Sequence, residues 1–224
     1  MISLLVTARK DSKFLAKFVM TFISHTKRFD NVELLIFTPG GEWNKELLKF
    51  FTVMPVPIKV IDDETGLGRG GNHIFYQEAF KSAKGDWIWY LCDDHQLLDG
   101  YDQYITDYIK DLDPTKPVVI APAVDNSGRI SHILSRKFID TVGFAPQGNV
   151  DSCINETLER LELLTGNTDI LHLPLIPVLH DFSLDKDLFK SEPFDAEYEK
   201  ALFKSQGLKD KLQADAEKLY LCLK

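Results

Sequence analysis

The chain has 224 residues, 44% of them hydrophobic, and a formal net charge of −8 at pH 7. This length and apolar content suit one large or two small domains with a buried core. The acidic balance argues against a broad nucleic-acid-binding face, and no apolar stretch reaches the ~20 residues that span a bilayer. The three widely spaced cysteines argue against a disulfide framework or a zinc cluster. Because a signal-peptide pattern is also absent, we expect a cytoplasmic globular protein.

Strand and helix patterns alternate in the first half of the chain. Short apolar runs rich in β-branched residues predict strands at 2–7, 32–37, 58–61 and 87–91. Apolar residues at helical spacing predict helices at 14–23, 43–51 and 74–83. Such alternation predicts a mostly parallel sheet with helices on both faces, in which ligands bind beyond the carboxyl ends of the strands. Polar residues at 7–9, after 61 and at 93–95 should therefore share one rim.

The second half of the chain is less regular. Apolar runs predict strands at 118–121 and 170–173, and helical spacing predicts helices at 130–142 and 151–164. The run 175–179 is flanked or interrupted by prolines, so we expect an edge strand or an extended loop there. The charged tail at 195–223 has a helical apolar stripe.

The strongest local signal is Asp93-Asp94-His95, which directly follows the strand predicted at 87–91. On an extended backbone Asp93 and His95 can face the same point while Asp94 faces away. Oxygen and imidazole ligands together suit manganese, zinc or a similar divalent ion, and magnesium less well. The alternative interpretation is a polar strand end that begins a loop, with Asp94 capping a turn.

A second signal is the glycine-rich segment 65–73. Its glycines let backbone N–H groups approach a phosphate, the following helix N-terminus adds partial positive charge, and Arg69 can bind a phosphate with two hydrogen bonds. The spacing of Gly66, Gly68 and Gly71 also fits the dinucleotide fingerprint, so an NAD-binding Rossmann oxidoreductase is a competing interpretation. However, these glycines follow the third strand rather than the first, and the fingerprint does not account for His95.

The run from Gly68 to His95 resembles the central region of inverting GT-A-fold glycosyltransferases. The shared features are a Gly-Arg-Gly-Gly-Asn turn before a helix, Ala83-Lys84-Gly85-Asp86, an apolar strand, and a DXD metal motif in its DXH form. The resemblance reaches upstream to Thr7 and downstream to about residue 181. It implies an α/β, GT-A-type, Rossmann-like three-layer fold with a mostly parallel central sheet.

The resemblance also implies the residues of the site. Nucleotide-sugar contacts are implied for Thr7, Arg9, Gly68, Arg69, Asn72, Asp93 and Asp94. Metal ligation is implied for Asp93, His95 and the late histidine His180, with manganese favoured and magnesium as the alternative. Asp151, at a predicted helix start, is implied as the catalytic base. For His180 and Asp151 an ordinary surface histidine and a helix N-cap remain the alternatives.

We therefore predict a metal-dependent glycosyltransferase that moves a sugar from a nucleoside-diphosphate sugar to an acceptor hydroxyl with inversion. A uridine diphosphate sugar is favoured, although Thr38-Pro39-Gly40 stands where the family often has an acidic residue for the base. The expected acceptor is a glycan, a lipid-linked molecule or a small molecule, with no nucleic-acid partner and no transmembrane segment.

We expect one domain over 1–224, with a nucleotide-binding half (1–95), an acceptor and catalytic half (96–181) and a helical tail (182–224). Membership of a larger multidomain enzyme stays open. A nucleotidyltransferase that forms nucleotide sugars is a second enzyme class on a similar scaffold, but residues 7–11 lack its glycine- and lysine-rich loop. A sugar-nucleotide-binding module without catalysis is a third interpretation.

Overall fold

The computed structural model describes most of the first two thirds of the chain and a long C-terminal helix. The described residues are 1–8, 13–38, 46–47, 49–51, 53, 55–62, 72–122, 131–143, 150–165, 170–173, 178–180 and 206–223. The structure describes only the backbone, and not the side chains, at residues 62, 72–75, 121–122, 150–152, 170–173 and 178–180.

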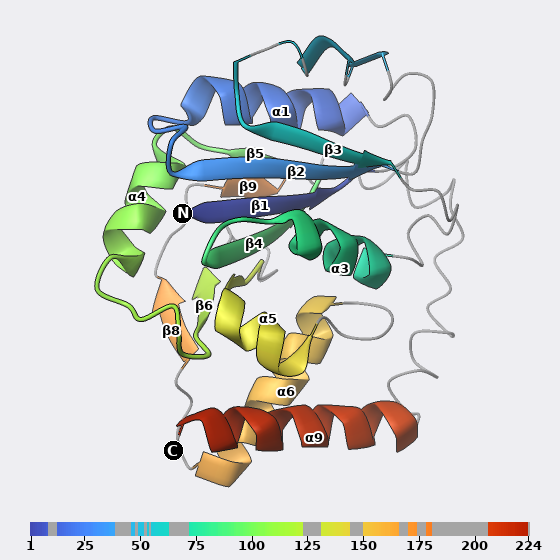
Figure 1. Ribbon diagram of the computed structural model, residues 1–224, viewed down its shortest axis with the longest axis vertical. Helices are drawn as coiled ribbons and strands as arrows, with labels where there is room; N and C mark the ends of the chain where they lie inside the picture. Colours follow the sequence, from blue (N-terminus) through green and yellow to red (C-terminus); the bar gives the residue numbers. More distant parts are fainter. Residues whose placement is uncertain are drawn as a thin grey trace.

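A seven-stranded sheet runs through the described residues in the order β3-β2-β1-β4-β7-β6-β8 (Figure 1). Its strands are β1 (Ile2–Thr7), β2 (Val32–Thr38), β3 (Ile58–Asp62), β4 (Trp87–Cys92), β6 (Val119–Pro122), β7 (Ile133–Ser135) and β8 (Ile170–Leu173). Only β7 pairs antiparallel with its neighbours in this sheet, whereas the other adjacent pairs are parallel. The predicted α/β fold with a mostly parallel central sheet is confirmed.

Helices cover both faces of the sheet because successive strand residues point to opposite sides. Leu4 and Val6 of β1 share a buried cluster with α1 (Lys13–His25) and α4 (Tyr101–Ile109). Leu5, between them, belongs to a second cluster on the other face. That cluster includes residues of α3 (Asn72–Ser82), α5 (Arg136–Val142), α6 (Val150–Thr165) and α9 (Gln206–Leu223).

The C-terminal helix α9 lies at the opposite end of the molecule from α1 (Figure 1). It packs along α6 and α5 and buries Leu208, Leu212, Ala216 and Leu219. Burying each leucine contributes roughly 1.5–3 kcal/mol, so the apolar stripe of the tail accounts for its docking. None of the described helices combines the length and apolar character that a membrane span needs.

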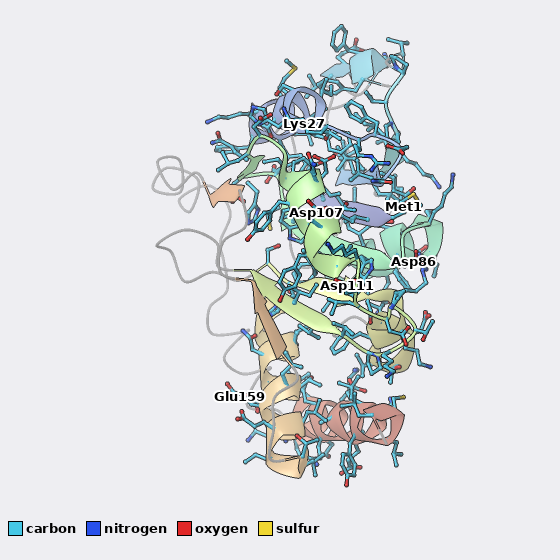
Figure 2. All side chains as sticks on the ribbon, turned by 90° about the vertical axis from the view of Figure 1, so that its left-hand side faces the viewer. Met1, Lys27, Asp86, Asp107, Asp111 and Glu159 are labelled. Atoms are coloured by element: carbon cyan, nitrogen blue, oxygen red, sulfur yellow. The ribbon has the colours of Figure 1, made fainter. Side chains whose placement is uncertain are left out.

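The segment before β4 packs tightly against the start of β1. A Cβ atom on Gly85 would lie 2.6 Å from Ser3 Oγ and 2.7 Å from Ser3 N, so a larger residue would force the backbone apart. The Gly85 N–H donates to Ser3 Oγ (2.8 Å), and the Arg136 guanidinium donates to the carbonyls of Ala83 and Gly85. In Figure 2, Met1 lies close to Asp86, and its amino group is 3.7 Å from the Asp86 carboxylate.

The prediction of one helix over 130–142 is wrong. Residues Ile133–Ser135 form β7, which pairs with β4 and β6, and the helix α5 begins only at Arg136. The boundary is set by Ser135, whose Oγ accepts the Phe138 N–H at 3.2 Å and caps the helix. Two further elements, α4 and β5 (His95–Leu97), were not predicted.

Candidate functional site

The carboxyl ends of β1, β2, β3 and β4 lie in register along one edge of the sheet. Thr7, the last residue of β1, pairs with Phe37 of β2 and with Cys92 of β4. Thr38 at the end of β2 pairs with Asp62 at the end of β3. The Asp93 N–H donates to the Thr7 carbonyl at 3.2 Å. This edge therefore brings two of the predicted donor-binding residues, Thr7 and Asp93, together.

The rest of the predicted donor site falls largely outside the described residues. Arg9, Gly68 and Arg69 belong to segments that the structure does not describe. Asn72 is described by its backbone, as the first residue of α3. The glycine segment thus leads into a helix, as predicted, and the N–H groups of a helix N-terminus favour anionic ligands.

The buried side chain of Tyr76 on α3 contacts the ends of both β1 and β4. Its hydroxyl donates to the Leu91 carbonyl at 3.1 Å and lies 3.4 Å from Thr7 Oγ1. Its ring packs edge-on against Tyr90, with the ring centroids 5.5 Å apart. This buried side chain thus links α3 to the ends of the paired strands β1 and β4.

After β4 the chain turns at residues 93–94 before it enters β5. Asp93, Asp94 and His95 are all buried, with 1%, 5% and 8% of their surfaces exposed. His95 Nδ1 lies 3.0 Å from the Cys92 nitrogen, 3.1 Å from the Cys92 carbonyl oxygen and 3.5 Å from Asp94 Oδ1. The expected strand-like alternation fails here because of the turn, and Asp94 approaches the His95 ring instead of facing away.

Three potential metal-ligating side chains meet at this turn. Among the described residues, Cys92 Sγ, an Asp94 carboxylate oxygen and a ring nitrogen of His95 lie within 4.8 Å of one another. A thiol, a carboxylate and an imidazole together fit a divalent ion of intermediate softness. Cys92 was not predicted for this site. Its position directly before Asp93 was the available signal, but the alternation argument placed it on the side away from His95.

His180 lies opposite this turn. The strand β9 (Val178–His180) pairs antiparallel with β5, and His95 and His180 are direct partners in that ladder. Residues directly opposite in an antiparallel pair have Cβ atoms about 4.5–5.5 Å apart. The backbone thus places the predicted late histidine beside the predicted early one, and metal ligation by His180 remains a prediction.

Asp151, the predicted base, is the second residue of α6, and the structure describes only its backbone. One turn later on the same helix, the Asn155 side chain hydrogen-bonds to His132. His132 Nδ1 also lies 2.6 Å from the Tyr90 hydroxyl of β4. Helix α6 is therefore fixed to β4 through a buried polar chain four residues after Asp151.

Burial determines the charge state of His132. Only 1% of its surface is exposed, and this burial lowers its pKa to about 4, although its hydrogen bond to the Asn155 side chain raises the pKa. His132 is consequently neutral near pH 7. Its hydrogen bonds to Tyr90 and Asn155 give it a structural role.

Comparisons with known proteins identify the fold. No protein-family model matches the chain, and no curated protein matches its sequence. A mannosyltransferase from Pyrobaculum calidifontis, solved with GDP-Man and Mn²⁺, has 10% identity and a TM-score of 0.60 over 97% of this chain and 69% of its own. Glucosyl-3-phosphoglycerate synthase from Mycobacterium tuberculosis, solved with Mn²⁺, UDP and its product, has 14% identity and a TM-score of 0.60 over 84% and 74%. The chain has a GT-A fold.

The same GT-A fold occurs in TarS from S. aureus, solved with UDP-GlcNAc. There the identity is 12% and the TM-score 0.58, over 69% of this chain and 52% of TarS residues 1–349. The matched part of the chain thus covers about half of that fragment, and 32% of the longer TarS chain. At these identities the comparison establishes the fold, and the activity has to be argued from the site.

Proposed function

We propose that the chain is a metal-dependent glycosyltransferase that moves a sugar from a nucleoside-diphosphate sugar to an acceptor hydroxyl. The observation that carries the proposal is the buried turn Cys92–His95, which presents carboxylate and imidazole groups at the carboxyl edge of a GT-A sheet beside Thr7. Similar structures contain UDP-GlcNAc, GDP-Man with Mn²⁺, or UDP with Mn²⁺. All of these nucleotides carry a diphosphate, the group that such a site recognises, and we favour UDP.

The donor is held from two sides in this proposal. Thr7 and Arg9 contact the nucleoside, while Arg69 and the backbone around Gly68 and Asn72 bind the phosphates at the start of α3. Asp93, His95 and His180 would hold the divalent ion, and Asp94 would add its negative charge at the same turn. A divalent ion held there would supply positive charge to offset the charge that develops on the leaving diphosphate.

The transfer itself is a single displacement. The acceptor oxygen forms a bond to the anomeric carbon as the bond from that carbon to the diphosphate oxygen breaks, and the electron pair leaves with the diphosphate. The carboxylate of Asp151 takes the acceptor proton, which raises the nucleophilicity of the oxygen during attack. Attack from the face opposite the leaving group inverts the anomeric centre.

A ligand screen followed by product analysis tests this function. Thermal unfolding is measured with UDP- and GDP-sugars and with NAD, each in manganese, magnesium or a chelator. A donor at 100 times its Kd should add about 2.7 kcal/mol of stability, and only when a divalent ion is present. The anomeric configuration of the product is then read by NMR. Stabilisation by NAD with no response to any nucleotide sugar would favour the oxidoreductase interpretation, and donor binding without transfer or hydrolysis would indicate a binding module.

A further inference from the structure

We propose that Cys92 supplies a thiolate ligand to the metal site at the end of β4, so that this site selects zinc-like ions over magnesium. The inference rests on the metal site of the proposed function but not on the transfer reaction. It adds Cys92, a ligand that the DXH motif does not contain, and it makes Asp94 a ligand beside His95, because these three side chains are the ones that lie together. It also changes the ion that the site should prefer.

The first argument is proximity. The Cys92 sulfur, an Asp94 oxygen and a His95 nitrogen lie within 4.8 Å of one another. Around a tetrahedral zinc ion, with bonds of about 2.0–2.3 Å, neighbouring ligand atoms lie roughly 3.5 Å apart. The three groups therefore need to close by only ~1 Å, which small rotations of the Cys92 and Asp94 side chains can supply.

The second argument is the orientation of the His95 ring. Its Nδ1 atom lies 3.0 Å from the Cys92 nitrogen, 3.1 Å from the Cys92 carbonyl oxygen and 3.5 Å from Asp94 Oδ1. In one tautomer Nδ1 accepts the Cys92 N–H; in the other the Nδ1–H donates to the Cys92 carbonyl, and Nε2 is then the basic nitrogen of the neutral ring. A histidine ligand needs this kind of support, because a hydrogen bond at one ring nitrogen fixes the tautomer that leaves the other for the metal. The backbone of Cys92 thus orients one ligand, and its side chain lies next to it.

The third argument is chemical selectivity. Sites made only of carboxylates and water suit magnesium, whereas thiolates select zinc and similar ions. When the metal–sulfur bond forms, the thiol proton is released to solvent, leaving Cys–S⁻ bound to the divalent ion. The ion also offsets the negative charge of Asp94, a buried carboxylate. Cys92 itself is only partly buried.

Alkylation of the unmodified chain by iodoacetamide provides the first test, with peptide mass spectrometry to follow each cysteine. Saturating zinc should slow alkylation of Cys92 by about 10-fold or more, because a metal-bound thiolate is no longer available as a nucleophile. Cys222 is exposed and lies on α9, so its alkylation should not change, which makes it an internal control. Equal alkylation of Cys92 with and without zinc would overturn the proposal.

Cobalt provides the second test, because a sulfur-to-cobalt charge-transfer band reports the ligand directly and without any sugar donor. The band should appear with the wild-type chain and with Cys222→Ser, and should be lost in Cys92→Ser. Zinc affinity should fall in Cys92→Ser by more than the 10–100-fold that loss of an outer-shell partner costs. Cobalt bound without this band would show that only oxygen and nitrogen ligate it, and would also overturn the proposal.

These outcomes separate the two proposals. A charge-transfer band in a chain that binds no nucleotide sugar would support the thiolate site and contradict the glycosyltransferase function. Manganese-dependent donor binding with Cys92 still reactive in zinc would support the function and contradict the thiolate ligand.

Discussion

The two ends of β4 differ in what their polar groups contact. At the amino end the Gly85 N–H meets Ser3, the Gly85 and Ala83 carbonyls accept from Arg136, and the Met1 carbonyl accepts the Asp86 N–H at 3.1 Å. These partners are fixed parts of the fold. At the carboxyl end, the Asp94 carboxylate, the Cys92 thiol and the His95 imidazole lie within 4.8 Å of one another, and Asp93 in the same turn is buried. Such a cluster suits a ligand better than it suits stability.

This comparison divides the sequence motif into two parts. The motif that resembles glycosyltransferases spans both Ala83-Lys84-Gly85-Asp86 and Asp93-Asp94-His95. The first part is explained by packing, because β1 approaches Gly85 too closely for any Cβ atom. The second part instead brings metal-ligating side chains together at the strand end. Variants at the amino end should therefore lower stability, whereas variants at the carboxyl end should lower activity.

The largest effect is expected from Asp93→Ala at the carboxyl end. Transfer should fall by ~100-fold or more and donor affinity should lose its dependence on a divalent ion, because a bound metal supplies several kcal/mol to the transition state. Titration calorimetry of the donor in manganese and in chelator measures the dependence. Asp99→Ala is the matched control, since this exposed aspartate pairs with Lys27 away from the strand ends. Equal donor binding by the wild-type chain in manganese and in chelator would contradict the metal hypothesis.

Asp151→Asn should reduce the rate of transfer by ~100-fold while donor and metal binding stay nearly normal, because only the proton acceptor is lost. Single-turnover kinetics with saturating donor measure this change. Asp140→Asn, on α5, serves as the control for removal of a carboxylate from a neighbouring helix. A wild-type rate for Asp151→Asn would show that Asp151 is not the base. Another group near the carboxyl end of β4 would then have to take the acceptor proton.

Much of the fold could be predicted because the parallel strands β1 to β4 and the helices between them have clear local hydrophobic patterns. β1 to β4 are short apolar strands, and α1 and α3 have clear apolar faces, so pattern alone finds them. β7 was missed because it has only three residues, and so short an apolar run does not distinguish strand from helix. α4 carries the buried acid Asp102, whose carboxylate accepts the N–H groups of Lys27 and Arg28. No local pattern indicates such a long-range partner.

The candidate site was predictable in position but not in arrangement. Parallel strand order places Thr7 and Asp93 at one edge, and the residue types of Asp93-Asp94-His95 predict a metal site there. The sequence pattern does not predict the turn at 93–94. This turn brings the Asp94 carboxylate close to the His95 ring, where an extended strand would have kept them on opposite sides. The pairing of His95 with His180 joins segments 85 positions apart, and only the resemblance indicated it.

At the amino end of β4, Gly85→Ala should lower the free energy of unfolding by roughly 3 kcal/mol, the upper part of the usual range for overpacking, because the clash is with backbone. Urea unfolding measures the loss. Gly207→Ala is the matched control, since a Cβ there meets no atom within 4 Å and a helical alanine should stabilise by about 0.5–1 kcal/mol. Transfer per folded molecule should stay at the wild-type level in both variants. Loss of transfer in folded Gly85→Ala would mean that the two ends of the strand are coupled.

The smallest effect concerns the middle of β4, where Tyr90 contacts His132. Burial lowers the His132 pKa to about 4, whereas an unfolded histidine titrates near 6.5. Between these values the unfolded chain binds the proton more readily, so this contribution to stability is complete above pH 6.5 and is lost as the pH falls toward 4. Over this pH range, linkage predicts that the free energy of unfolding falls by about 2 kcal/mol between pH 7 and pH 5.

Urea unfolding of the wild-type chain and of His132→Gln at both pH values measures this loss. The difference between the two proteins isolates the His132 side chain from the carboxylates that both share. The variant should lose about 2 kcal/mol less than the wild type on acidification. Equal losses would show that His132 takes up its proton in the folded chain as readily as in water, and that the polar chain from β4 to α6 tolerates the charge.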